Sequence, residues 1–350
     1  MREEEMHSAL QFVAPGTPLR QALDNVIAGK TGALIAIGDE TGVDSLSNGG
    51  FVIDASFTHQ RLFELAKMDG AILLDAEATR IRRANVHLMP DPSLPTTETG
   101  MRHRTAERVS RQTQALVVSV SQRREVVTLY RNGERISLAD IDVVLAKASQ
   151  AVQTLERYRT RLTEVSTHLT ELEFEDLATF GDVAVVLHRF EMLRRVGREL
   201  SRYIIELGTE GRLVRMQADE LTAGAEDDFL MLVRDYMPDS GPRKAVAALA
   251  RIAALTPEQL LDPGALAVAL GYAPTADIDE QHVRPKGYRL LHRVPLLPAT
   301  VINRLVDRFG SLKAILAATE QQLDDVDGVG ARRARAISDG LRRMRERAVL

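Results

Sequence analysis

The chain has 350 residues, more than one typical domain holds, so we expect two or three domains. Hydrophobic residues make up 45% of the sequence, enough for real cores, and the absence of cysteine excludes disulfides, thiolate catalysis and zinc–cysteine sites. An acidic start with no apolar run behind it, and no stretch of 18 apolar residues, predict a soluble cytoplasmic protein without signal peptide or membrane contact.

The net charge of −4 hides an asymmetry between the two ends of the chain. Residues 286–350 hold 13 Lys and Arg against 7 Asp and Glu, a net charge of +6, which leaves −10 for residues 1–285. A basic C-terminal module on an acidic body indicates a polyanionic partner for that module.

Residues 1–137 alternate short apolar runs with amphipathic stretches, which is typical of an α/β domain around a mixed sheet. We expect buried strands at 33–37, 71–74 and 115–120, and helices at 18–28, 58–67 and 105–114. Asn132-Gly133, between 126–130 and Ile136, predicts a closing hairpin because this dipeptide favours a two-residue turn. Three prolines and four Ser or Thr residues in 90–100 indicate a mobile loop.

Two common nucleotide-binding loops are excluded in this first domain. Gly29-Lys30-Thr31 is similar to the end of a Walker A loop, but Asp24 stands where the leading glycine is required. No Gly-x-Gly-x-x-Gly run follows a predicted strand. A nucleotide site in this domain therefore has to be of a less common kind.

Two short runs carry candidate chemistry: Asp69-Gly70-Ala71 at a turn, and residues 102–107, which read Arg-His-Arg-Thr-Ala-Glu. A carboxylate at a turn can hold a metal ion or a hydroxyl proton, while guanidinium and imidazole groups suit phosphate oxygens. Phosphoryl and nucleotidyl transfer need these parts because that chemistry rests on positioning and charge neutralisation. Taken alone, Asp-Gly is most often a turn and Arg-His-Arg a solvated basic face.

In this order and spacing the two runs resemble the DGA and RHR motifs of the bacterial diadenylate cyclase domain. The resemblance includes the segments 32–38, 68–74 and 100–107. With a helical middle and a helix-hairpin-helix end, the full layout is similar to the DNA-integrity scanning diadenylate cyclases of bacteria. The resemblance implies condensation of two ATP molecules into cyclic di-AMP and two pyrophosphates, with Mg²⁺, or Mn²⁺ in its place. It also implies a homo-octamer with paired catalytic domains, and inhibition of activity by branched DNA.

The resemblance further implies roles for single residues. Asp69 is expected to bind the metal and help to deprotonate the 3′-hydroxyl, and Gly70 to let the backbone approach the nucleotide. The phosphates are expected to be held by Arg102, His103, Arg104 and Thr105.

Three weaker assignments follow from the same resemblance. Leu88 matches a position that contacts adenine, and Ser121 a hydroxyl beside the phosphates or the metal. Met101 belongs to the nucleotide-binding run but fills a place where relatives carry threonine, so its side chain is not expected to carry chemistry.

From residue 138 to 285 the pattern becomes helical throughout. Ser137, with Asp140 three residues on, predicts a capped helix start, after which apolar residues repeat at steps of four and three. The seam consists of Val144, Ala148, Ala151, Leu155, Tyr158, Leu162, Val165, Leu169 and Leu172. It fits a helix packed in its own bundle and an intermolecular coiled coil equally well, since more helices are expected at 180–207, 227–236 and 242–255. We expect an all-helical linker domain without chemistry of its own.

Residues 286–350 end in a helix-hairpin-helix pattern. Gly328 and Gly330 allow a tight turn that aims amide groups and a helix N-terminus at one phosphate, beside Arg332, Arg333 and Arg335. The equivalent segment 294–301 has proline where glycine would stand, so this first hairpin is degenerate. Such contacts read the backbone of double-stranded or branched DNA rather than its bases.

Two other functions stay open from the residues alone. The chain could be a DNA-junction scaffold that binds a nucleotide without turning it over, against which the intact Asp69 and arginines argue. It could also be a subunit of a repair nuclease, but Asp69 and Asp75 are too few carboxylates for a two-metal cluster.

Overall fold

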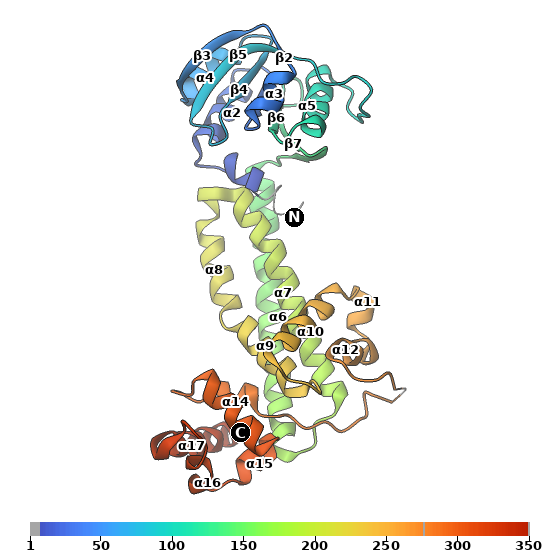
Figure 1. The fold of residues 1–350 in the computed structure, drawn as a ribbon, viewed down its shortest axis with the longest axis vertical. Helices are drawn as coiled ribbons and strands as arrows, with labels where there is room; N and C mark the ends of the chain where they lie inside the picture. The colour runs from blue at the N-terminus through green and yellow to red at the C-terminus, as the bar shows by residue number, and fades with distance from the viewer. Residues whose placement is uncertain (1–7, 276, 349–350) are drawn as a thin grey trace. The chain divides into compact units, whose positions relative to one another are not determined.

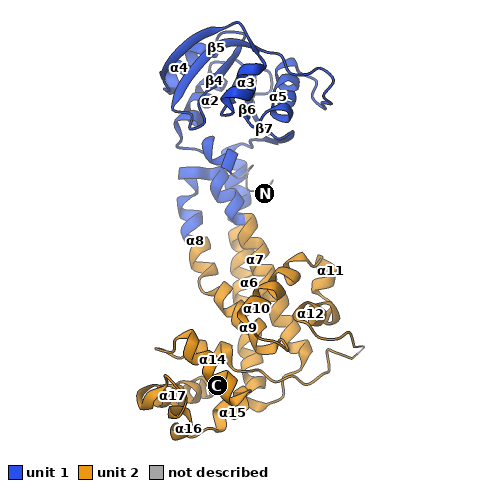
Figure 2. Ribbon diagram, viewed as in Figure 1, with its two compact units in different colours: residues 1–150, 200–216 blue, residues 151–199, 217–350 orange. Residues whose placement is uncertain are grey.

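The computed structural model describes residues 8–275 and 277–348. The chain divides into two compact units (Figures 1 and 2). The first unit holds residues 1–150 and 200–216, and the second holds residues 151–199 and 217–350.

The first unit is built on an eight-stranded mixed sheet with the strand order β2-β5-β4-β1-β6-β7-β8, in which β3 pairs with β5. Its strands are β1 Ala33–Ile37, β2 Ser47–Asn48, β3 Phe51–Ser56, β4 Ala71–Leu74, β5 Arg80–Leu88, β6 Leu116–Ser121, β7 Val126–Arg131 and β8 Glu134–Ser137. β1 and β4 are parallel, and the other pairs are antiparallel. All residues of β1 and β4 are buried, as expected of central strands covered on both faces.

Helices cover both faces of this sheet (Figure 1). They are α2 Pro18–Ala28, α3 Glu40–Ser45, α4 His59–Leu65 and α5 Met101–Gln112. Leu23 of α2 and Leu62 of α4 pack in one core with Ile35, whose side chain points to their face of the sheet. Val109 of α5 packs with Leu34, on the opposite face. The N-terminus of α5 thereby lies over the sheet, anchored by its own apolar side.

The strands and the hairpin expected from the sequence are confirmed, with β6 shifted by one residue. Asn132 and Gly133 have φ of 53° and 76°, the pair of positive values that a type I′ turn requires. The strands β2, β3 and β5 were not expected. α5 begins at Met101, four residues before the predicted start, so the Arg-His-Arg run forms its first turn.

The predicted helix start at Ser137 is wrong. Ser137 is the last residue of β8, and α6 begins at Ile141. Asp140 provides the polar group at this end, because its Oδ1 accepts a hydrogen bond of 2.8 Å from the amide of Asp142. The hydroxyl of Ser137 instead lies 3.3 Å from that of Thr128 in the neighbouring strand.

The other regular elements of the described chain are helices. They are α6 Ile141–Glu175, α7 Phe180–Leu207, η1 Gly208–Gly211, α8 Arg212–Thr222, α9 Ala225–Tyr236, α10 Pro242–Ala254, α11 Pro257–Leu260, α12 Pro263–Leu270, α13 Tyr288–His292, α14 Ala299–Phe309, α15 Leu312–Ala317, α16 Glu320–Asp324 and α17 Gly330–Ala348. In the predicted seam Leu155, Leu162 and Leu169 are at most 3% exposed within the single chain. Val144 and Ala148 are buried as well, whereas Ala151, Tyr158, Val165 and Leu172 are partly buried. More than half of the seam is therefore buried within the single chain.

A buried polar joint ties α13 to α9 and α6 in the second unit. The carboxylate of Asp235 accepts hydrogen bonds of 2.6–3.0 Å from the amides of Gly287, Tyr288 and Arg289, and so caps α13. Arg289 is 1% exposed and pairs with Glu173 of α6. A buried charge is tolerated only when paired in this way. Over residues 8–275 and 277–348, no helix has both the length and the apolar character needed to cross a membrane.

Candidate functional site

The two predicted motifs meet in the first unit. Asp69 lies in the turn between α4 and β4 with its side chain fully exposed, and its Oδ1 is 3.6 Å from Nη2 of Arg102. Arg102 is in the first turn of α5. The structure thus brings together an exposed carboxylate and a guanidinium group that are far apart in the sequence.

Gly32 makes room for the side chain of Arg102. A Cβ atom at Gly32 would lie 2.2 Å from Nη1 of Arg102 and 3.2 Å from the carbonyl oxygen of Val120. Any side chain at this position would displace the guanidinium group from its place at the start of β1. The sequence resemblance included Gly32, but its role is visible only in the structure.

The N-terminus of α5 presents the Arg-His-Arg run. Gly100 begins the helix without a side-chain cap, so the first amides are left for an outside acceptor. The positive end of a helix with free amides favours phosphate groups. Arg104 is exposed, Thr105 is partly buried, and Met101 is 84% exposed. Cationic side chains and a helix N-terminus therefore act on the same small region.

Gly70 is packed against the protein backbone. A Cβ atom there would lie 2.3–2.6 Å from the backbone of Asn85 and Val86 in β5. The amide of Gly70 donates a 3.2 Å hydrogen bond to Oδ1 of Asn85, which has a φ of 53° where the β4–β5 register shifts. The glycine is needed to hold the Asp69 turn against this irregular strand.

Leu88 and Ser121 also lie at strand ends near these motifs. The antiparallel register pairs Ala71 with Val86, so Leu88 ends β5 at the same edge of the sheet as Asp69. Ser121 ends β6, beside the β1 end that Gly32 precedes, and its Oγ accepts a 3.3 Å hydrogen bond from the amide of Arg124.

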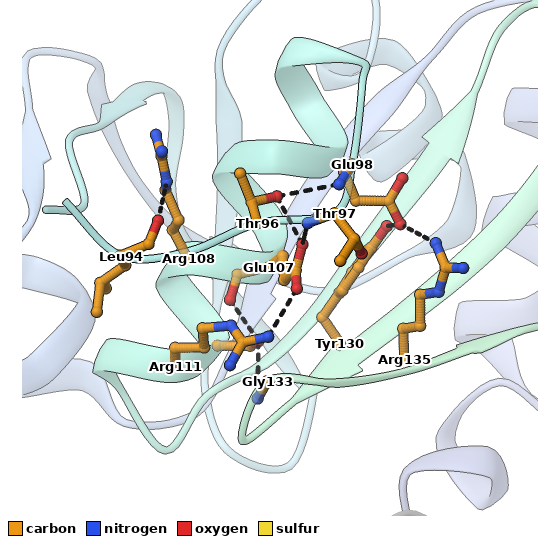
Figure 3. Close-up of polar contacts among 11 residues, drawn as sticks. Leu94, Thr96, Thr97, Glu98, Glu107, Arg108, Arg111, Tyr130, Gly133 and Arg135 are labelled. Carbon is orange, nitrogen blue, oxygen red and sulfur yellow. Dashed lines mark hydrogen bonds and ion pairs between the residues drawn. The ribbon is translucent and has the colours of Figure 1, made fainter. Parts of the chain in front are cut away.

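A loop that precedes α5 is tied to that helix by polar contacts (Figure 3). Glu107 is 3% exposed and accepts hydrogen bonds from Thr96 Oγ1 at 2.6 Å and the amide of Thr97 at 3.1 Å. Arg111 lies 2.8 Å from the same carboxylate. Burial acts to raise the pKa of Glu107, but the hydrogen bonds from Arg111 and Thr96 hold it below its usual range. The predicted loop 90–100 thus has fixed contacts near its end.

Three groups that the sequence did not indicate are linked by hydrogen bonds to the histidine of the run, one of them directly. Glu98 accepts hydrogen bonds from Tyr130 Oη at 2.9 Å and from Arg135 Nη1 at 2.6 Å, as Figure 3 shows. Tyr130 is fully buried in β7, and its Oη lies 3.0 Å from Nδ1 of His103. These residues come from a loop and two strands, so no local sequence pattern marks them as a set.

A divalent metal ion fits this donor set through a single carboxylate. Among the described residues there is no group of three or more His, Cys, Asp or Glu side chains that could bind a metal. Mg²⁺ often binds through one or two carboxylates plus substrate phosphates and water. The exposed Asp69 provides one hard oxygen ligand, so a metal here would share its remaining ligands with a nucleotide.

The second predicted site is the hairpin between α16 and α17. Gly328 and Gly330 have φ of 86° and 66°, values that favour glycine. Arg333 Nη1 donates a 2.6 Å hydrogen bond to the carbonyl of Gly328, so this arginine supports the turn. Arg335 lies 3.7 Å from Glu320, whereas Arg332 is exposed.

The corresponding hairpin before α14 keeps half of this geometry. Leu296 has a φ of 67°, like Gly328, and is 67% exposed. Pro298 has a φ of −65° where Gly330 is positive, and proline has no amide hydrogen. The first hairpin therefore offers a phosphate one donor fewer than the second.

Two family models match the chain. Residues 20–135 match the "DisA bacterial checkpoint controller nucleotide-binding" model, and residues 138–278 match the "DisA bacterial checkpoint controller linker region" model. Both models are named for the same family and follow one another along the chain.

Curated relatives match over almost the full length. Each is named "DNA integrity scanning protein DisA". The one from Symbiobacterium thermophilum is 51% identical over 96% of this chain and 95% of its own. Those from Carboxydothermus hydrogenoformans and Bacillus licheniformis are 48% and 46% identical over 99% of this chain and 98% and 96% of theirs. A solved structure, DacA from Staphylococcus aureus, is 22% identical over 40% of this chain and 89% of its own, with a TM-score of 0.30.

The matches cover both the region that contains Asp69 and Arg102 and the helical region that follows it. The relatives are about one half identical over nearly the whole of both chains. The chain belongs to the DisA family of bacterial checkpoint controllers, and its first domain is a diadenylate cyclase domain.

Proposed function

We propose that the protein condenses two ATP molecules into cyclic di-AMP and two pyrophosphates, and that DNA bound at its C-terminal domain regulates the reaction. The observation that carries the proposal is the meeting of Asp69 and Arg102, 3.6 Å apart, at the N-terminus of α5. A group suited to a metal and a hydroxyl proton thus lies beside groups suited to phosphates.

Each of the two bonds is formed by the same displacement. The 3′-oxygen of one ATP forms a bond to the α-phosphorus of the other, the bond from that phosphorus to the bridging oxygen breaks, and pyrophosphate leaves. Asp69 is placed to accept a hydrogen bond from the 3′-hydroxyl and to help remove its proton. Mg²⁺, or Mn²⁺ in its place, would be held by Asp69 and supply charge neutralisation at the phosphates.

The arginines bind and orient the triphosphate. Arg102 is held against Gly32, which limits the positions its guanidinium group can take. Arg104 and Thr105 extend the same helix turn, and the free amides of α5 add partial positive charge. Pyrophosphate carries more negative charge as it leaves, so these groups also stabilise the leaving group. Ser121 and Leu88 would contact the phosphate side and the adenine respectively.

The reaction requires two copies of the cyclase domain. A single bound ATP cannot supply both the attacking hydroxyl and the second phosphorus, so two domains have to present their nucleotides to each other. Closed symmetric assemblies satisfy this in pairs. We propose an octamer with paired catalytic domains, each chain divided into a cyclase domain of residues 1–137, a helical linker of 138–285 and a hairpin domain of 286–350, acting in the cytoplasm.

The C-terminal hairpins are proposed to bind double-stranded or branched DNA through its phosphates, and branched DNA is proposed to lower the cyclase rate. The positive φ values of Gly328 and Gly330 and the exposed Arg332 support a phosphate contact at the second hairpin. The net charge of +6 on residues 286–350 supports a polyanionic partner.

Product analysis tests the proposal against its two rivals. The full chain is incubated with ATP and Mg²⁺, and separately with branched DNA, and all products are identified by mass spectrometry. Cyclic di-AMP supports the proposal. ATP that is bound but unchanged would identify a scaffold, and cleaved DNA would identify a nuclease; either result without cyclic di-AMP contradicts the proposal.

A further inference from the structure

His103 is the end of a partly buried series of hydrogen bonds that begins at the surface. Arg135 of β8 donates to Oε1 of Glu98 at 2.6 Å, and Tyr130 of β7 donates to the same oxygen at 2.9 Å. Nδ1 of His103 lies 3.0 Å from the oxygen of Tyr130. The three contacts connect a loop, two strands and the first turn of α5.

Counting hydrogens fixes the direction of the last contact. A phenol has one hydrogen, and Tyr130 gives its hydrogen to Glu98. Burial acts to raise the pKa of Glu98, but hydrogen bonds from Arg135 and Tyr130 hold it below its usual range, so this carboxylate is ionised and accepts only. Burial and the bond to Glu98 raise the pKa of Tyr130, so the phenol stays protonated. The oxygen of Tyr130 can then only accept, and Nδ1 of His103 has to donate.

We propose that Tyr130 and Glu98 are positioning residues that hold His103 in the tautomer with its hydrogen on Nδ1. The lone pair is then on Nε2, which acts as an acceptor for an O–H donor, a nucleotide hydroxyl or a bound water molecule. The catalytic meaning of this inference rests on the proposed cyclase function. In the Arg-His-Arg run, the two arginines would thus act as hydrogen-bond donors and His103 between them as an acceptor. His103 would not donate to a phosphate oxygen.

The charges around His103 favour its neutral form. Burial lowers the pKa of His103, the guanidinium groups of Arg124, Arg102 and Arg135 lower it further, and the carboxylate of Glu98 acts in the opposite direction. A neutral imidazole carries one hydrogen, which the contact with Tyr130 places on Nδ1. Glu107 supports the arrangement, because its bonds to Thr96 and Thr97 fix the loop next to Glu98.

The test combines a direct reading of the tautomer with kinetics. Solid-state ¹⁵N NMR of the sedimented full chain with labelled histidine reports which ring nitrogen carries the hydrogen, and a His103→Gln variant assigns the signal by difference. In the wild type we expect a neutral ring of His103 with its hydrogen on Nδ1. In Tyr130→Phe we expect the distribution of this hydrogen between Nδ1 and Nε2 to change. This reading needs no activity, so it remains decisive even for a protein that makes no cyclic di-AMP, a result that would contradict the proposed function alone.

Kinetics separate positioning from a merely structural role. In Tyr130→Phe we expect kcat to fall at least about tenfold with an unchanged Kd for ATP, as for other partners that orient a functional histidine. Glu98→Ala should behave alike, while Glu98→Gln, which keeps an oxygen to accept from Tyr130, should retain more activity. Tyr158→Phe in α6 is the matched control and should equal the wild type.

Four results would overturn the inference. Three of them are a hydrogen on Nε2 of His103 in the wild type, a wild-type kcat in Tyr130→Phe, and a loss in Tyr130→Phe that is confined to the Kd for ATP. Equal activity in Glu98→Ala and Glu98→Gln at a reduced level would also contradict it, because the oxygen that accepts from Tyr130 would then have no effect.

Discussion

Arg102 and Arg104 lie in the same helix turn but in different surroundings. Arg102 is partly buried, pressed against Gly32 and 3.6 Å from Asp69, whereas Arg104 is exposed. The contact with Asp69 is a surface ion pair and adds little stability to the folded chain. Both side chains are therefore available for a ligand, and their removal should leave the fold intact.

Replacement of both arginines, Arg102→Ala with Arg104→Ala, is expected to weaken ATP binding. Each substitution removes charge-assisted hydrogen bonds from a guanidinium group to phosphate, which contribute about 1.5–3 kcal/mol. The Kd for ATP should therefore rise by more than a factor of ten. Isothermal titration calorimetry with ATP measures the change. Arg61→Ala, an exposed arginine of α4 in the same domain, is the matched control. Equal affinity in the double variant and the control would place the phosphates elsewhere.

At the scale of elements, the turn that carries Asp69 depends on how β4 meets β5. Gly70 touches the backbone of Asn85 and Val86, and the register between the two strands shifts there. Protein interiors are packed too closely to accept a new atom against backbone without a shift. The position of the Asp69 carboxylate is therefore coupled to the irregularity in β5.

Gly70→Ala is expected to destabilise the protein by about 1–3 kcal/mol, because its Cβ would lie 2.3–2.6 Å from backbone atoms. Thermal unfolding followed by calorimetry measures the loss. Gly197→Ala in the middle of α7 is the contrasting variant, since its Cβ would meet Thr222 at an ordinary 3.5 Å. That variant should be stabilised by about 0.5–1 kcal/mol. A Gly70→Ala protein as stable as the wild type would show that β5 can yield at this point.

Two neighbouring arginines at the hairpin before α17 have different roles. Arg333 donates to the carbonyl of Gly328 and so shapes the turn, while Arg332 is exposed. In Arg332→Ala we expect weaker DNA binding and a plot of log Kd against log salt that is less steep by about 0.9, the value for one phosphate contact. Arg161→Ala on α6 is the control. An unchanged salt slope in Arg332→Ala would remove this residue from the interface.

The helices and strands that could be predicted from the sequence are those whose signals are local. β1 and β4 are continuous apolar runs, and α2 begins at Pro18 with Thr17 as its N-cap, so all three follow from local pattern. β5 carries arginines and a histidine among its apolar residues, because it is only partly covered, and its period is broken at Asn85. The start of α5 was predicted late because Gly100 provides no side-chain cap.

The candidate site shows the same division. Asp69 belongs to one short run and Arg102 and Arg104 to another, and both runs can be found by reading the sequence locally. The structure places Asp69 next to Arg102. Glu98, Tyr130 and their bond could not be predicted, because the contact joins a loop to a strand thirty-two positions along the chain. Tertiary packing decides whether a tyrosine is buried and which group its hydroxyl contacts. A local sequence pattern does not contain this information.

At the scale of the whole molecule, the charge is divided between the ends of the chain. Residues 286–350 carry +6 and residues 1–285 carry −10. This division supports the proposal that DNA contacts the basic C-terminal domain rather than the acidic body. A ligand bound there can change activity at Asp69 only through states of the assembly that it binds with different affinity.

A four-way DNA junction is expected to lower the cyclase rate of the wild type. The variant with both Arg332→Glu and Arg333→Glu should lose this response and keep its activity without DNA, since neither residue belongs to the cyclase domain. The measurement is the rate of cyclic di-AMP formation with and without junction DNA for both proteins. Equal inhibition of both would show that the hairpin is not the sensor, and no inhibition of either would contradict regulation by DNA.

The central claim, that Asp69 and the α5 N-terminus form a diadenylate cyclase site, is tested most directly by Asp69→Asn. The amide keeps the shape of the side chain but loses its charge and basicity, and the exposed position predicts an unchanged fold. Cyclic di-AMP formed from ATP and Mg²⁺ is quantified by mass spectrometry, beside ATP affinity, for the wild type, Asp69→Asn and the control Asp24→Asn on α2. We expect product from the wild type and the control, and none from Asp69→Asn, which should still bind ATP. Near wild-type product from Asp69→Asn would contradict the central claim.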